Sequence, residues 1–147
     1  MKIAVKQISK EQEELVAVYC HEVSDEVREI VGFVKSLQGQ LTGSMDGREY
    51  EIAITDIYYV ESVDNRTYLY AANKVYETKM KLYELENTLG NKRFMRASKS
   101  VILNLMKVRS IKPAMNGRFT AVLQSGEEII ISRKYVPDLK EKIRGGK

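Results

Sequence analysis

The feature that most constrains the fold is a series of short strand-like runs that begins near Tyr50. Four of them, EYEIAI, DIYYVESV, RTYLYAA and KVYETK, are rich in Tyr, Val and Ile and are separated by turn residues at 64–66 and 72–73. Further along, Asn116-Gly117 is the strongest hairpin signal, because a type I′ turn needs a positive φ at both positions, and Ser125-Gly126 marks the next turn. The series predicts a mostly β fold (α+β overall) of short antiparallel strands.

Three short helices are expected beside these strands. Ser24 suits the N-cap of the first helix, which carries an apolar stripe at helical spacing made of Val27, Ile30, Val31, Val34 and Leu37. The second helix is expected over residues 79–89. The third is expected over about 133–144, where Pro137 is tolerated in the first turn.

The first 45 residues differ in texture from the rest. KIAVKQI and ELVAVYC have the alternation or the β-branched content of short strands, and they precede the first helix. Residues 38–47 contain three glycines and are the expected boundary. The sequence therefore predicts a small ββα appendage at 1–45, followed by a β domain at 46–147.

Charge divides the chain into an acidic front and a basic back. Residues 1–86 hold ten basic and sixteen acidic side chains, whereas residues 87–147 hold fourteen and four. Forty consecutive residues, 87–126, contain no acid and carry Lys92, Arg93, Arg96, Lys99, Lys107, Arg109, Lys112 and Arg118. Clustered cations favour a polyanionic partner, because binding to phosphates releases condensed counterions. The alternative is a solvated rim in which lysines protect sheet edges from aggregation.

Residue patterns typical of enzymes and metalloproteins are sparse in the sequence. Cys20 and His21 are its one cysteine and its one histidine, and neighbours on a strand point to opposite faces, which disfavours a nucleophilic pair. These two residues are too few ligands for zinc, and no phosphate-binding or nucleophile-elbow motif occurs. We therefore expect no catalytic site, no metal and no cofactor.

The sequence also indicates a location. The N-terminus has no apolar run of signal-peptide length, and no stretch approaches the ~18 uninterrupted apolar residues of a membrane span. A single cysteine cannot form an internal disulfide, which fits a reducing compartment. We expect a cytoplasmic protein.

Several segments occur in an order that is typical of one family. They are Asp56-Ile-Tyr-Tyr-Val-Glu61-Ser, Phe94-Met-Arg96-Ala-Ser98-Lys99-Ser100-Val-Ile-Leu-Asn104, Ile111-Lys112-Pro113, Gly117-Arg118-Phe119 and Ser132-Arg133-Lys134-Tyr135-Val136. Over roughly residues 46–144 the chain resembles the LytTR DNA-binding domain family. The resemblance implies stacked small antiparallel sheets with short helices, whose loops enter successive major grooves of duplex DNA. It also implies a bacterial-type, sequence-specific transcription regulator with no small-molecule substrate.

Three loops carry the DNA contacts that the resemblance implies. The first matches Asn65-Arg66-Thr67, and the third matches Arg133-Lys134. The second matches Lys99 between Ser98 and Ser100, whose hydroxyls are also expected to contact DNA, on phosphates. Because Arg and Lys can pair with guanine O6 and N7, Lys99 and Arg133 are the expected base readers, with a phosphate contact as the alternative for each. Arg118 is expected on a phosphate. Two alternatives stay open: Arg96 touches DNA or braces its loop, and Asn65 touches DNA or only shapes the turn.

Many members of this family are response regulators with a receiver domain of roughly 100 residues in front. Only residues 1–45 precede the resemblance here, so the chain looks like the stand-alone members, some of which are paired with small membrane proteins. Control by phosphorelay is not expected, whereas a homodimer on repeated DNA sites is. Dimerisation, docking of a small membrane protein and packing on the β domain all remain open as roles for residues 1–45.

Two other classes of protein also remain open. A single-stranded nucleic-acid module would need exposed aromatic rings near the cations, and the basic half offers Phe94, Phe119 and Tyr135. A protein-interaction module without nucleic acid would bind its partner in a way that survives a large rise in salt. The tyrosines of the strand-like runs are expected in the core and in cross-strand pairs.

Overall fold

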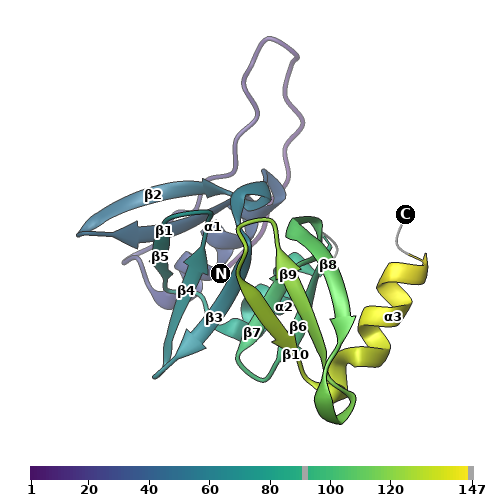
Figure 1. Cartoon of the computed structure of the whole chain (residues 1–147). Helices are drawn as coiled ribbons and strands as arrows, with labels where there is room; N and C mark the ends of the chain where they lie inside the picture. Colours follow the sequence, from purple (N-terminus) through teal and green to yellow (C-terminus); the bar gives the residue numbers. More distant parts are fainter. Residues whose placement is uncertain (91–92, 146–147) are drawn as a thin grey trace.

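The computed structural model describes residues 1–90 and 93–145, and its strands form two antiparallel sheets beside three helices (Figure 1). The larger sheet has seven strands in the order β2-β1-β5-β4-β3-β7-β6. They are β1 (Gln40–Met45), β2 (Arg48–Ala53), β3 (Tyr59–Val63), β4 (Arg66–Tyr70), β5 (Val75–Thr78), β6 (Phe94–Ser98) and β7 (Val101–Asn104). The four strand-like runs that begin near Tyr50 form β2 to β5, so the prediction of a mostly β fold is confirmed.

The smaller sheet has three strands in the order β10-β9-β8, namely β8 (Val108–Pro113), β9 (Phe119–Leu123) and β10 (Glu128–Ile131). Asn116 and Gly117 join β8 to β9 with φ angles of 60° and 75°, so both have the positive φ that the sequence predicts. The hydroxyl of Tyr59 on β3 donates a hydrogen bond of 3.0 Å to Glu127 in the turn between β9 and β10. This bond ties the smaller sheet to the larger one.

The helices lie close to their expected positions. Helix α1 (Asp25–Leu37) begins after Ser24, whose hydroxyl accepts a hydrogen bond of 3.3 Å from the N–H of Val27. Helix α2 (Leu82–Leu89) is shorter than expected, because its first turn is closed by a bond of 2.7 Å from the N–H of Lys81 to the Glu84 carboxylate. Helix α3 (Val136–Gly145) follows a 3₁₀ turn at Arg133–Tyr135 and so begins later than expected.

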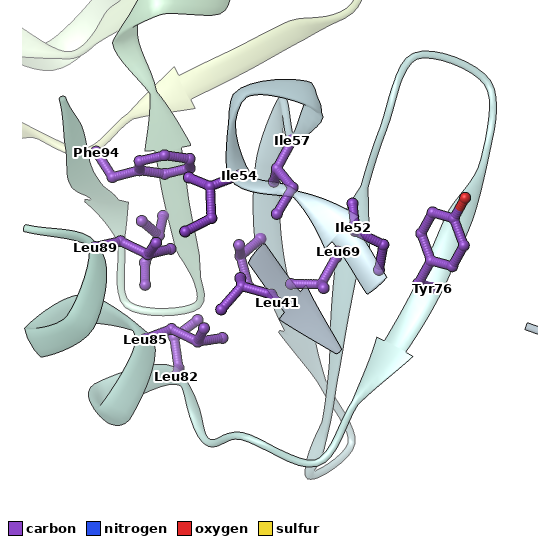
Figure 2. Close-up of a cluster of buried hydrophobic side chains, with 12 residues drawn as sticks. Leu41, Ile52, Ile54, Ile57, Leu69, Tyr76, Leu82, Leu85, Leu89 and Phe94 are labelled. Atoms are coloured by element: carbon purple, nitrogen blue, oxygen red, sulfur yellow. The ribbon is translucent and has the colours of Figure 1, made fainter. Parts of the chain in front are cut away.

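Strand β7 and the first two residues of β3 are buried on both faces, because a hydrophobic core lies on either side of them. One core includes Val60 and Ile102 and is covered by the leucines of α2 (Figure 2). The other includes Tyr59 and Leu103 and is covered by the smaller sheet and the start of α3. Since successive residues of a strand point to opposite faces, all four residues of β7 are buried.

The apolar stripe of α1 is only partly covered. The helix packs against β1 and α2, and Lys35 Nζ donates a bond of 2.7 Å to Glu51 on β2, which holds the helix to the β1–β2 hairpin. Val27 is buried, whereas Val31 and Leu37 are 39% and 65% exposed. The predicted stripe is therefore open to solvent at both of its edges.

The two strands expected within residues 1–23 are not formed. This segment has one turn, in which the N–H of Gln12 donates to the carbonyl of Ser9 at 3.2 Å, and it projects away from both sheets as a long open loop (Figure 1). A strand is stabilised by a neighbour that pairs with its N–H and C=O groups. None of the described strands pairs with this segment, so its alternating sequence stays extended without becoming part of a sheet.

Strand β1 occupies the region that was expected to be a boundary. Its neighbours are β2 and β5, so a division at residue 45 would cut the β1–β2 hairpin. Gly43 lies in the middle of β1, where a Cβ would come within 2.8 Å of Ile52 and Tyr76, so this glycine permits close packing rather than flexibility. The division into 1–45 and 46–147 stays a prediction.

Candidate nucleic-acid interface

Two of the expected contact loops lie side by side at one end of the larger sheet. Asp64 and Asn65 form the β3–β4 loop, and Lys99 lies in the β6–β7 loop. The N–H of Ser62 on β3 donates a hydrogen bond of 2.9 Å to the carbonyl of Ser100, next to Lys99. A main-chain bond thus fixes the spacing between the two loops.

Two further loops join them. The N–H of Ser132 donates a bond of 2.8 Å to the carbonyl of Ala97 on β6, which places Arg133 beside the strand that leads to Lys99. Gly117 in the β8–β9 turn lies against Arg133, because a Cβ at Gly117 would be 2.8 Å from Arg133 Cδ. The tips of all four loops lie along the lower side of the molecule in Figure 1.

The structure therefore brings the expected cations to a common edge, which we call the cationic rim. It consists of five exposed side chains: Arg66, Lys99, Arg118, Arg133 and Lys134. Arginine and lysine at loop tips can bind phosphates or the guanine edge in the major groove. The rim is therefore chemically suited to duplex DNA.

The β3–β4 loop is a two-residue turn with positive φ at both positions, 51° at Asp64 and 65° at Asn65. Asn65 is exposed, and so is Arg66, whose guanidinium lies 3.7 Å from the Glu77 carboxylate in an open ion pair. An ion pair this open contributes little stability and leaves the guanidinium accessible. Thr67 differs from both, because it is 4% exposed and its side chain supports the loop from inside.

The β6–β7 loop presents Lys99 between two serines, as the sequence suggests. The N–H of Ser100 donates a hydrogen bond of 3.2 Å to Ser98 Oγ, which closes the turn. Lys99 is exposed, whereas both serines are half-buried. The serines thus shape the loop, and the lysine is its accessible group.

Arg96 lies behind this loop. Its side chain is 17% exposed, and its Nε lies 3.8 Å from the Glu86 carboxylate of α2. This ion pair links β6 to α2 on the face that carries Ile102. Of the two roles left open by the sequence, the geometry favours bracing over direct contact.

The acid-free stretch does not form one continuous basic surface. Lys99 and Arg118 lie on the rim, but Lys107 lies at the opposite end of β8, with its Nζ 5.1 Å from the centre of the Tyr58 ring. Most of residues 101–105 are buried strand. Lys92 lies outside the described residues.

The aromatic rings of the basic half are not arranged as a stacking platform. Phe94 is 2% exposed and belongs to a core. Phe119 and Tyr135 are partly buried, and each has a lysine over its ring, Lys140 and Lys134 respectively, at 5.7 Å and 5.5 Å from the ring centre. This arrangement disfavours the single-stranded nucleic-acid class, which needs exposed rings.

The strand tyrosines have structural roles, as predicted. Tyr59 and Tyr70 stack across β3 and β4 with their ring centres 4.3 Å apart. Burial, followed by the hydrogen bond to Glu127, raises the pKa of Tyr59 well above its usual range. Burial and the nearby Glu61 raise the pKa of Tyr70. Both hydroxyls therefore stay protonated near neutral pH.

Outside the rim, no second site gathers chemically reactive groups among the described residues. Cys20 and His21 are both exposed on the extended N-terminal segment. In residues 1–90 and 93–145, no three His, Cys, Asp or Glu side chains come together as a metal site would require. None of the described helices is long and apolar enough to cross a membrane.

Comparison with known proteins gives a consistent result. Residues 47–144 match the family described as the LytTr DNA-binding domain. An uncharacterized HTH-type transcriptional regulator of Staphylococcus aureus (strain MSSA476) is 26% identical over 145 residues, covering 97% of this chain and 98% of that protein. The sensory transduction protein LytT of Enterococcus faecalis (strain ATCC 700802 / V583) is 31% identical over 98 residues, covering 67% of this chain and 40% of that protein. A solved LytTr DNA-binding domain from Bacillus cereus superposes with a TM-score of 0.68 at 23% identity, covering 71% of this chain and 96% of that domain.

The fold, the cationic rim and these matches define a DNA-binding domain. The chain belongs to the LytTR family, which confirms the resemblance seen in its sequence. This is a family of DNA-binding domains rather than of enzymes. In the described part of the chain, strands separate α1, α2 and α3 from one another, so the rim is built from loops and not from a helix-turn-helix.

Proposed function

We propose that this chain is a sequence-specific transcription regulator that binds duplex DNA through the cationic rim. The observation that carries the proposal is that four cationic loops are held together at one edge. Main-chain hydrogen bonds join Ser62 to Ser100 and Ser132 to Ala97. Gly117 also packs against Arg133. Loops held in this way keep their spacing, so their side chains can meet successive positions along a groove. The relatives named as transcriptional regulators support the regulatory role.

Within the rim we assign two kinds of contact. Lys99 and Arg133 are proposed to reach base edges in the major groove, where either can pair with guanine O6 and N7. Arg66, Arg118 and Lys134 are proposed to hold phosphates, with Asn65 beside them, and thereby to set the register of the protein on DNA. Thr67, Ser98 and Ser100 are proposed to shape the loops, and Arg96 to brace them.

We further propose that the regulator acts in the cytoplasm as a homodimer on repeated sites. Two-fold dimers are the commonest assembly of soluble proteins, and two rims would read two half-sites separated by whole helical turns of about 10–10.5 base pairs. We also propose a small membrane protein as a second partner, for the N-terminal part of the chain. A module that binds only another protein would not need five exposed cations clustered on the rim. This clustering therefore disfavours the protein-interaction class.

Selection of bound fragments from random duplex DNA tests this function. We expect enrichment of a short motif that occurs twice, at a spacing set by the helical repeat. Competition with bulk duplex and with single strands of the same sequence should show that the duplex site is preferred. If no sequence is enriched over bulk DNA at moderate salt, the chain is not a sequence-specific regulator.

A further inference from the structure

The N-terminal arm, residues 1–23, exposes apolar side chains along its whole length. Ile3 and Val5 are 92% and 95% exposed before the turn, and Leu15 and Tyr19 are 77% and 93% exposed after it. The arm precedes α1, which adds exposed Phe33 and Leu37 on one side of the helix, four residues apart, and exposed Val31 on the other. Exposed apolar groups that extend over one segment and the adjoining helix mark a surface that another molecule covers.

None of the strands in the described part of the chain pairs with the backbone of the arm. Among the described residues, its recorded main-chain bonds are the Gln12–Ser9 turn and a bond of 3.0 Å from the N–H of Ser24 to the carbonyl of Glu22. Extended segments with open N–H and C=O groups are templates for pairing with another strand. An isolated two-stranded hairpin is marginal in water, whereas three or more strands with an apolar face are stable. A single arm supplies two extended limbs, residues 1–10 and residues 11–23. Two arms together therefore supply four segments that can pair as strands.

Charge indicates what the second molecule is. The first limb, residues 1–10, carries Lys2, Lys6 and Lys10 and no acid. The second limb, residues 11–23, carries Glu11, Glu13, Glu14 and Glu22 and neither Lys nor Arg. An arm with one basic and one acidic limb is complementary to a copy of itself, because a two-fold axis can bring each limb against the opposite limb of the other copy.

The size of the arm fits this partner. A stable interface commonly uses about 20–30 residues from each side, and the arm has 23 residues. The arm is not peculiar to this chain, since the match to the Staphylococcus aureus regulator covers 97% of this sequence and 98% of the relative. The turn of the arm projects from the upper side of the molecule, whereas the loops of the cationic rim lie along the lower side (Figure 1).

We propose that the N-terminal arms of two copies pair into one intermolecular sheet, with the basic limb of each copy against the acidic limb of the other. This rests on the dimer of the proposed function and specifies the surface that makes it, without depending on DNA. The exposed apolar side chains of the arms, with Phe33 and Leu37 of α1, become the covered face of this sheet.

Charge reversal on the arm tests the pairing, with the oligomeric state of the full chain measured by analytical ultracentrifugation without DNA. The native chain is expected to dimerise. Two triple variants are expected to weaken dimerisation by about tenfold or more, since each carries limbs of one sign. The variants are Lys2→Glu, Lys6→Glu, Lys10→Glu in one chain and Glu11→Lys, Glu13→Lys, Glu14→Lys in the other. An equimolar mixture of the two variants is expected to restore dimers, because their arms again carry opposite charge.

The matched control reverses three exposed lysines outside the arm, with Lys74→Glu, Lys79→Glu and Lys112→Glu, and should dimerise like the native chain. Since the arm lies apart from both cores, the arm variants should unfold at the same urea concentration as the native chain when both are diluted until they are monomers. A native chain that is monomeric at every concentration overturns the proposal, as do arm variants that dimerise normally. DNA selection is scored separately, so a monomer that still selects a duplex site defeats the arm pairing and leaves the regulator function standing.

Discussion

Gly117 lies against the side chain of Arg133, so closely that a Cβ on the glycine would stand 2.8 Å from Arg133 Cδ. The two residues come from different loops, the β8–β9 turn and the 3₁₀ turn that precedes α3. The glycine therefore does two things: it adopts the positive φ of a tight turn, and it gives the stem of Arg133 a surface to lie on.

The first prediction separates these two properties. Gly117→Ala should destabilise the fold by about 1–2 kcal/mol through its positive φ and should also weaken DNA binding, because Arg133 must move. Gly47→Ala is the matched control, since Gly47 has a φ of 77° in the β1–β2 turn with nothing within 4 Å of its missing Cβ. It should lose similar stability in urea unfolding and keep native affinity for DNA. Equal affinities for the two variants would show that Arg133 does not depend on Gly117.

Lys99→Ala should reduce binding to the selected site by about 1–3 kcal/mol and change binding to unrelated duplex much less, because a base-reading side chain contributes discrimination. Lys74 on the β4–β5 turn lies at the other end of β4 and provides a control of equal charge. Fluorescence anisotropy with selected and scrambled duplexes measures both affinities. Equal losses on both duplexes would assign Lys99 to a phosphate.

Arg118→Ala should weaken binding to every duplex by a similar factor. A phosphate contact carries no sequence information, so the ratio of specific to non-specific affinity should stay at its native value. The slope of log K against log salt should become shallower by about one unit, because one phosphate contact is lost. A changed sequence preference with an unchanged salt slope would contradict this assignment.

Asn104 is predicted to be a major source of stability. It is 2% exposed, its Nδ2 donates a bond of 2.7 Å to the carbonyl of Ile57, and its Oδ1 accepts one of 2.9 Å from the N–H of Met106. Asn104→Ala leaves two main-chain groups without their partner and should lower the free energy of unfolding by about 2–4 kcal/mol in urea titrations. Asn87→Ala, at an exposed position of α2, is the control and should change it by less than about 0.5 kcal/mol.

Tyr59 should make stability depend on alkaline pH. Burial and the bond to Glu127 raise its pKa in the folded state above the value of about 10 in the unfolded chain. The folded state therefore holds this proton more tightly, and the resulting stability is full below pH ~10 and is lost as the pH rises toward the folded pKa. In Tyr59→Phe the decline between about pH 8 and 11 should be smaller than in the native chain, when urea unfolding is measured across that range. A decline as steep as the native one would show that another group is responsible.

Much of the β framework could be predicted from the sequence, because local residue patterns determine its strands and turns. Tyr, Val and Ile alternate between turn residues, and Asn116-Gly117 predicts a turn whose φ angles the structure confirms. Ser24 likewise predicts the start of α1 through its own hydroxyl. In each of these cases the determining contacts lie within a few residues of one another.

What depends on distant contacts could not be predicted. Glycines at 39, 43 and 47 predict a boundary, but Gly43 permits close packing of β1 on Ile52 and Tyr76. Alternation in residues 1–23 predicts strands, although none of the described strands pairs with this segment. The sequence predicts the contact residues of each loop separately. That these loops lie together on one rim follows from the pairing of β3 with β7 and from the hydrogen bond between Ser132 and Ala97.

The two hydrogen bonds that join the rim, Ser62 to Ser100 and Ser132 to Ala97, are made by the main chain, so they do not depend on which side chains occupy the tips. The residues proposed to contact DNA can therefore be exchanged while the positions that carry them stay in place. A scaffold of this kind lets new DNA preferences evolve by single substitutions at loop tips, without renewed selection on folding.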